Sequence, residues 1–279
     1  MIGEFIMNNL LIRAKESFGF RLNGLIEKLA YKKLALGWKL ETGISIQIDN
    51  HAEWVIYNDI FVEGEYDNAI EASILNLEQS ISGRTEFVFV DIGANVGYFT
   101  LRAIDIFRRS KLQDFGINAV LVEGSPAVYQ ALKTRIESQY LEEKIANIEI
   151  VNGLAGELEG DGIISETSFH VMNSVLLNDS KKNGKLVPYV NLNLLCSKYS
   201  NIDLIKCDIE GSEEKLIQNY GNILSKAKFL IFEFHPLLCD IQRCFQMLSE
   251  IGFKKFTIVR KTDAFEVVFF ERRDNINAY

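Results

Sequence analysis

Short apolar runs alternate with amphipathic segments along most of the chain after residue 85. The apolar runs predict buried strands at 87–90, 119–122, 148–151, 202–207, 229–234, 256–259 and 265–270. Apolar residues at helical spacing predict helices over 97–109, 126–140, 212–220 and 237–251. The turn before the last strand is too short for a parallel crossover, so that strand should run antiparallel. The pattern therefore predicts an α/β fold with a mostly parallel, seven-stranded sheet closed by an antiparallel last strand.

The first 84 residues follow a different pattern. Residues 8–36 combine helical spacing with interleaved Lys and Arg, and alternating isoleucines at 44–48 indicate a half-buried strand. A second strand is expected over 54–62 and a helix over 67–81. We interpret 1–84 as an N-terminal cap or flank and 85–279 as the main domain. An insertion at 157–200 carries two strand-like runs, 163–172 and 186–194.

Composition excludes several classes of protein. The chain has 279 residues, 30 Lys and Arg against 38 Asp and Glu, and a formal charge of −8, which counts against a general nucleic-acid binder. No apolar run is long enough for a transmembrane helix and no secretion signal is visible, so a cytoplasmic location is expected. None of the four cysteines forms a C-x-x-C pair, which disfavours a structural zinc site.

Polar residues stand where successive predicted strands end. Asp91, Glu123, Asp208 and His235 each follow or close an apolar run. Ligands of open parallel sheets bind outside the carboxyl ends of the strands, so these side chains mark a candidate site. Taken singly, each also fits an ordinary solvated loop.

The first of these strand ends is a glycine loop with an acidic start, DIGANVG. Gly93 permits a tight turn with close ligand approach, and Gly97 lets the next helix begin close to the strand. The spacing is not the G-x-G-x-x-G of a dinucleotide site. Asp91 would repel a pyrophosphate and favour a cationic ligand such as a sulfonium. Glu123, after the second strand, is placed to accept hydrogen bonds from ribose hydroxyls.

Ionisable residues cluster in the segment KCDIEGSEE. Lys206, Asp208 and Glu210 alternate and would share one face if strand geometry continued, and Ser212 is expected to cap the following helix. A structural Lys–carboxylate network is the alternative to a functional cluster. His235, at the end of FLIFEFHP, lies on the same side of the predicted sheet and is equally open to a structural or a catalytic role.

Together, DIGANVGYFT, VEGSP, LIKCDIEGSEEKLI and FEFHP resemble the FkbM-type family of S-adenosylmethionine-dependent methyltransferases, over roughly residues 43–272. The resemblance implies a Rossmann-like class I methyltransferase fold and S-adenosylmethionine as methyl donor. It also implies acceptor hydroxyls on sugars, glycans or complex natural products. Gly124 stands where the family usually has proline. That difference loosens the turn but leaves the carboxylate of Glu123.

Carried over by position, the resemblance assigns site residues. Those expected to bind the donor are Asp91, Gly93, Asn95, Gly97, Glu123, Leu154, Ala155 and Asp208. The candidates for catalysis are His235, Asp208 and Glu210, and His235 has the most suitable ordinary pKa for a general base. Apart from the resemblance, the insertion 157–200 and residues 1–84 are expected to line the acceptor cleft, because loops vary while the scaffold holds the donor. The expected acceptor contacts are His170, Asn173, Ser174 and Lys206. Asp208 and Glu210 would also suit a divalent metal, but the sequence identifies no third ligand, so no metal is predicted.

Two rival functions and three roles for the N-terminus stay open. The chain lacks the glycine motif of an NAD-dependent oxidoreductase, which disfavours that function. A non-catalytic binding protein on the same fold is disfavoured by the intact acidic and glycine positions. Residues 1–40 carry seven Lys and Arg against three Glu, a net of +4, which leaves −12 for the rest of the chain. This segment would dock on the acidic body as a lid, mediate a homodimer, or contact an anionic membrane surface through residues 8–36. Docking is the favoured role.

Overall fold

The computed structural model describes residues 36–80, 83–139, 146–164 and 184–272. The chain divides into two compact units, residues 1–58 and 59–279. In the first, strands β1 (Gly37–Lys39) and β2 (Ser45–Gln47) pair antiparallel. They are followed by helix α2 (His51–Tyr57), which the Asn50 side chain caps by accepting from the Glu53 N–H. The domain boundary expected at residue 84 stays a prediction.

One expected strand is wrong. Residues 54–62 lie in α2 and in a π-helical turn, η1 (Asn58–Val62). The run of Trp, Val, Ile and Tyr favours a strand by propensity. The Asn50 cap outweighs it, because it satisfies a backbone N–H at the helix start. The expected helix over 67–81 is present as α3 (Asp67–Gln79).

The second unit is built around a seven-stranded sheet of order β10-β11-β9-β8-β3-β4-β5. Its strands are β3 (Glu86–Ile92), β4 (Gly116–Glu123), β5 (Ala146–Asn152), β8 (Ile202–Cys207), β9 (Ala227–Phe234), β10 (Lys255–Lys261) and β11 (Glu266–Glu271). The pairs among β5, β4, β3, β8 and β9 are parallel, and β11 runs antiparallel to both neighbours. The predicted fold class and the antiparallel last strand are confirmed.

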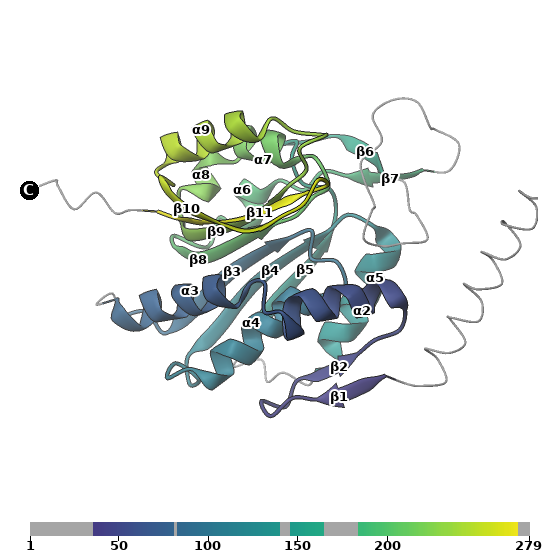
Figure 1. The fold of residues 1–279 in the computed structure, drawn as a ribbon, viewed down its shortest axis with the longest axis vertical. Helices are drawn as coiled ribbons and strands as arrows, with labels where there is room; N and C mark the ends of the chain where they lie inside the picture. Colours follow the sequence, from purple (N-terminus) through teal and green to yellow (C-terminus); the bar gives the residue numbers. More distant parts are fainter. Residues whose placement is uncertain (1–35, 81–82, 140–145, 165–183, 273–279) are drawn as a thin grey trace, which may run out of the picture. The chain divides into compact units, whose positions relative to one another are not determined.

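Helices cover both faces of this sheet (Figure 1). One face carries α3, α4 (Tyr98–Arg109) and α5 (Pro126–Glu137). The other carries α6 (Leu192–Leu195), α7 (Glu213–Asn219), α8 (Gly221–Leu224) and α9 (Ile241–Ile251). Because both faces are covered, the central strands are buried almost throughout, as their continuous apolar runs predict.

The predicted insertion begins as a small ribbon beside the sheet. Strands β6 (Asp161–Ile164) and β7 (Lys185–Pro188) pair antiparallel, and β7 leads into α6. Leu154, Ile164 and Val187 form a small apolar cluster under this ribbon. The second expected strand ends at Pro188, and 192–195 is helical instead.

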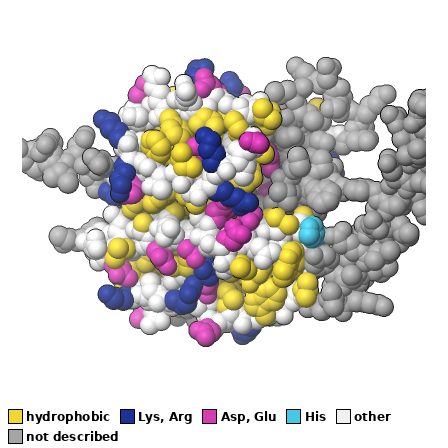
Figure 2. All heavy atoms as spheres, in the orientation of Figure 1, with side chains coloured by type: hydrophobic (Ala, Val, Ile, Leu, Met, Phe, Trp, Pro, Cys, Tyr) yellow, Lys and Arg dark blue, Asp and Glu magenta, His cyan; other side chains and the backbone are white. Residues whose placement is uncertain are grey.

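Surface charge is mixed on the face shown in Figure 2. Basic and acidic side chains are interspersed there, and the described residues form no continuous basic surface on it. No helix within the described ranges is long and apolar enough to cross a membrane.

Candidate active site

The loop after β3 lies where three strands of the sheet come together. The Gly93 N–H donates to the carbonyl of Val122 on β4 at 2.9 Å, and its carbonyl accepts from Lys206 Nζ on β8 at 2.8 Å. Gly93 has φ +76°, and a Cβ there would lie 1.7 Å from the carbonyl oxygen of Asp208. Only glycine fits this position, because both the backbone conformation and the space exclude a side chain.

Gly97 allows close packing at the start of α4. It has φ +90°, and a Cβ would lie 2.7 Å from Leu132 of α5. The neighbouring Asn95 adopts φ +48°, in the left-handed region that few residues other than glycine occupy. The loop therefore turns sharply, and its backbone faces the ends of the neighbouring strands.

A pocket opens at the carboxyl ends of β3, β4, β5 and β8, with a volume of about 590 Å³ including its open mouth. Its lining residues come from the ends of these four strands, the loops that follow them, and β6: Ile92, Gly93, Asn95, Val122, Glu123, Gly124, Gly153, Leu154, Ala155, Ile164, Asp208, Ile209 and Glu210. Three carboxylates border it and none of its lining residues is basic, so the pocket favours a cationic ligand over an anionic one.

Glu123 is held in place by backbone groups. One carboxylate oxygen accepts from the N–H of Asn95 at 2.9 Å and the other from the N–H of Ser125 at 2.7 Å. Burial raises the pKa of Glu123 to about 7, although both hydrogen bonds act in the opposite direction. Each carboxylate oxygen has a second lone pair, so the group can still accept from a ligand hydroxyl.

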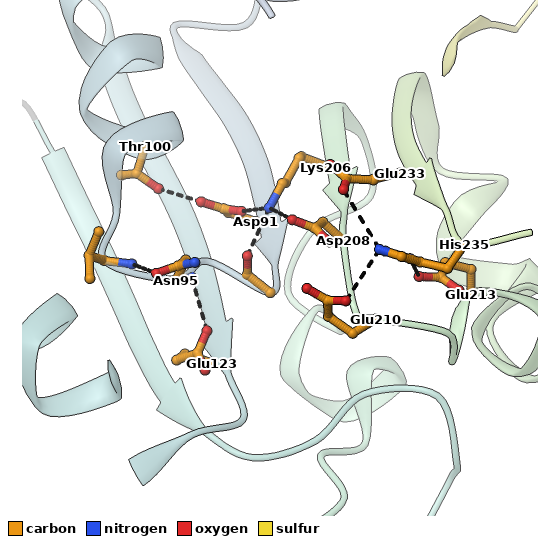
Figure 3. A network of polar contacts seen from close by, with 12 residues as sticks. Asp91, Asn95, Thr100, Glu123, Lys206, Asp208, Glu210, Glu213, Glu233 and His235 are labelled. Carbon is orange, nitrogen blue, oxygen red and sulfur yellow. Dashed lines mark hydrogen bonds and ion pairs between the residues drawn. The ribbon is translucent and has the colours of Figure 1, made fainter. Parts of the chain in front are cut away.

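Behind the pocket lies a buried ion-pair network (Figure 3). Lys206 Nζ stands 3.6 Å from an oxygen of Asp91 and 3.4 Å from an oxygen of Asp208. The other oxygen of Asp91 accepts from the Thr100 hydroxyl at 2.9 Å. Burial disfavours the Lys206 ammonium, but Asp208, Asp91 and Glu233 more than offset it and raise its pKa. Lys206 therefore stays charged and holds the carbonyl of Gly93.

A second cluster surrounds His235 at the end of β9 (Figure 3). Its Nδ1 lies 2.9 Å from Glu213 Oε1. On the other side of the ring, Nε2 lies 3.3 Å from Glu210 Oε2 and 3.7 Å from Glu233 Oε1. Glu210 has φ +53°, so the turn after β8 holds this residue in an uncommon conformation that brings its carboxylate to the ring.

These contacts change the proton affinities of the cluster. Burial lowers the pKa of His235, but the hydrogen bond and charge of Glu213, together with Glu210 and Asp208, raise it to about 9. Burial and the charge of Asp208 raise the pKa of Glu210 to about 7 and that of Glu233 to about 9. At neutral pH His235 is thus an imidazolium that donates protons, while Glu210 is poised to exchange one.

The structure brings many of the predicted site residues together. Seven line the pocket: Gly93, Asn95, Glu123, Leu154, Ala155, Asp208 and Glu210. Four stand outside its lining: Asp91, which is completely buried, Gly97, Lys206 and His235. The predicted acceptor residues His170, Asn173 and Ser174 lie outside the described residues.

Sequence reasoning missed two carboxylates. Glu233 lies two residues before His235 on β9, so strand alternation could have placed both on one side. Glu213 is the first residue of α7, a position where acidic residues are common for the helix alone, so the sequence gives no separate signal for it. Ser212 stands at the N-cap of α7, but its side chain makes no capping hydrogen bond, which makes that expectation wrong. Its backbone has φ −97° and ψ 10° instead of the extended conformation usual at an N-cap.

Asp208, Glu233 and His235 also bring their ligand atoms within 4.8 Å of one another. That spacing suits a shared proton as well as a small cation. The ammonium of Lys206 already faces Asp208, and His235 is an imidazolium at neutral pH. A metal ion held by these three residues would have to displace the proton of His235, and the expectation that the chain binds no metal stays a prediction.

The cluster predicts how stability depends on pH. Glu123, Glu210, Glu233 and His235 all have a higher pKa in the folded chain than their ordinary values of 4.5 for Glu and 6.5 for His. The folded state thus binds these protons more tightly, and the stability they contribute falls as pH rises from each ordinary pKa to the folded one. That loss ends near pH 7 for Glu123 and Glu210 and near pH 9 for Glu233 and His235. The melting temperature of the ligand-free protein should fall by roughly 5 °C between pH 6 and pH 9.

Differential scanning calorimetry would measure this fall. Glu233→Gln should flatten the dependence, while Glu137→Gln, at an exposed position on α5, should leave it unchanged. A melting temperature that rises over the same range would contradict the assignment of these pKa shifts.

Comparison with known proteins identifies the family. A model of the methyltransferase FkbM domain matches residues 91–262, well over half of the chain, including the glycine loop, the KCDIEGSEE segment and His235. The chain therefore belongs to the FkbM methyltransferase family, and its sheet is that of a class I methyltransferase. No curated protein gives a significant sequence match.

Solved structures of similar fold are distant in sequence. The FkbM methyltransferase from Methylobacillus flagellatus KT is 15% identical, with a TM-score of 0.45 over 68% of this chain and 44% of that one. Magnesium protoporphyrin IX methyltransferase from Synechocystis PCC 6803, with bound SAM, is 10% identical, with a TM-score of 0.42 over 76% of this chain and 82% of that one. Aeropyrum pernix fibrillarin, with S-adenosyl-L-methionine, is 12% identical, with a TM-score of 0.40 over 72% of this chain and 73% of that one.

Proposed function

We propose that this FkbM-family methyltransferase transfers the methyl group of S-adenosylmethionine to a hydroxyl oxygen of a sugar, glycan or complex natural product. One observation carries the proposal. Residues from four separate strand ends, assigned to the donor or to the chemistry from sequence, line a single pocket at the carboxyl edge of the sheet. Glu210 closes that pocket on the side of His235.

The donor fits the chemistry of the lining. Backbone groups of Gly93 and Asn95 would face its methionine part, and Glu123 would accept from the ribose hydroxyls. Leu154 and Ala155 would pack against the adenine. The carboxylates that border the pocket favour the positive charge of a sulfonium. The same charges would repel a pyrophosphate, which argues against the NAD-dependent alternative.

Glu210 is the best candidate for the general base. The donor supplies an already activated methyl group, so the protein must place the acceptor oxygen in line and take up its proton. His235 is positively charged at neutral pH and has no free site for that proton. Glu210 lines the pocket, and its pKa of about 7 lets it take up a proton at working pH. His235 would then orient the Glu210 carboxylate from behind.

Transfer of a labelled methyl group tests the proposal. The full chain, incubated with methyl-labelled S-adenosylmethionine and a panel of free sugars, sugar nucleotides, glycans and hydroxylated natural products, should label at least one acceptor. The product should withstand mild alkali, because a methyl ether is stable where a methyl ester is hydrolysed. An alkali-labile product would contradict O-methylation of a hydroxyl. Donor binding without transfer to any member of the panel would favour the non-catalytic alternative.

A single substitution separates donor binding from chemistry. His235→Ala should leave the affinity for S-adenosylhomocysteine within about threefold, because the ring is outside the pocket lining, and should lower turnover. Isothermal titration and the labelled-methyl assay would measure the two effects. Unchanged turnover of an identified acceptor would exclude His235 from the reaction.

A further inference from the structure

One buried carboxylate contacts both the turn that carries Glu210 and the ring of His235. Glu213, the first residue of α7, is 0% exposed. Its Oε1 accepts from the backbone N–H of Gly211 at 2.9 Å and lies 2.9 Å from Nδ1 of His235. A carboxylate can only accept, so Nδ1 carries the proton of this second hydrogen bond.

These two bonds fix two different elements. The bond to Gly211 holds the turn after β8, where Glu210 and Gly211 have φ +53° and +103°. The bond to His235 fixes the ring at the end of β9, so that Nε2 points to Glu210. Both elements therefore take their positions from a single oxygen atom.

The burial of Glu213 calls for a compensating charge. Moving an ionised carboxylate out of water is costly unless it is paired and hydrogen-bonded. Its Oε2 is buried and has no hydrogen-bond partner among the described residues. His235 is the cation in direct contact with it. A helix cap alone would need only an acceptor, and serine, threonine, asparagine or glutamine would supply one without a buried charge.

We propose that Glu213 is a positioning residue. It holds the Glu210 turn and the His235 ring in the arrangement that catalysis requires. This role rests on the proposed function, since it assigns Glu210 to the reacting hydroxyl. The other groups facing His235 are Glu210 and Asp208 from the end of β8, Glu233 on β9 and Cys239 before α9. Of the carboxylates, Glu213 makes the shortest contact with the ring.

Nitrogen NMR of the full chain with ¹⁵N-labelled histidine tests the contact without donor or acceptor. The sequence has only three histidines, and His235→Gln would assign the signal. The wild type should show a downfield Nδ1–H proton, and Glu213→Gln should lower the pKa of His235 by at least about one unit. Gln still offers an oxygen to Gly211, so the helix start is retained. Absence of the downfield proton in the wild type would overturn the proposal, even if the variant failed to fold.

Kinetics then test the consequence. Glu213→Gln should lower kcat by about 10- to 100-fold, while affinity for S-adenosylhomocysteine stays within about twofold, because Glu213 does not line the pocket. Glu214→Gln is the matched control: it alters the adjacent carboxylate, which contacts Arg243 and Gln218, and should keep wild-type kcat. Wild-type kcat in Glu213→Gln would overturn the proposal. If the wild type did not bind S-adenosylhomocysteine, the proposed function would be contradicted. The NMR evidence for the contact between Glu213 and His235 would still stand.

Discussion

Gly93→Ala should abolish donor binding, with a loss of affinity for S-adenosylhomocysteine of more than about 100-fold. The new Cβ would stand 1.7 Å from the carbonyl oxygen of Asp208, so the β3 loop and the β8 turn must separate. The change would also pull Gly93 away from Lys206 and from the Val122 carbonyl. Isothermal titration of the purified variant measures the effect.

Gly160→Ala is the matched control for this substitution. Gly160 has φ +94°, comparable to Gly93, but a Cβ there meets nothing within 4 Å. It therefore carries the same left-handed strain, about 1–2 kcal/mol, without the collision. Affinity within about threefold of wild type is expected. If both variants lost donor binding equally, backbone strain would explain the loss. The close approach of the β3 loop to the β8 turn would then not be its cause.

Glu210→Gln should produce the largest loss of turnover, roughly 10²- to 10⁴-fold, because the variant has no carboxylate to take up the hydroxyl proton. In the wild type, the rate should rise with pH through an apparent pKa of about 7 as Glu210 loses its proton. That rise should disappear in the variant. Donor affinity should change by less than about tenfold, since the side chain keeps its size.

The labelled-methyl assay as a function of pH measures both effects. Glu159→Gln replaces an exposed carboxylate between β5 and β6 and should retain the wild-type rate and profile. If Glu210→Gln kept the wild-type rate, Glu210 would not be the general base. Asp208 and Glu233, the nearest carboxylates in the cluster, would then be the next candidates.

Periodicity was sufficient to predict the sheet. The central strands are buried on both faces, so each is a continuous apolar run whose end is marked by a polar residue. The same reasoning found Glu123, Asp208 and Glu210, because strand ends of a parallel sheet converge on one edge. It failed at 54–62, where the aromatic and β-branched residues favoured a strand and the Asn50 cap produced a helix.

The environment of each site residue could not be derived from the sequence. Asp91 lies within β3, where it pairs in register with Lys206, and is therefore buried behind the loop instead of lining the pocket. His235 was given its ordinary pKa because Glu213, 22 residues earlier in the chain, is brought to Nδ1 only by the packing of α7 beside the end of β9. Such contacts depend on the tertiary structure, and no local pattern reports them.

The most direct test of the central claim is equilibrium titration of the full chain with S-adenosylhomocysteine. A parallel titration uses NAD⁺, whose pyrophosphate is anionic. We predict saturable 1:1 binding with a Kd on the order of micromolar, and no binding of NAD⁺ at the same concentrations. Failure to bind S-adenosylhomocysteine, or equal affinity for NAD⁺, would contradict the assignment of this pocket to a sulfonium methyl donor.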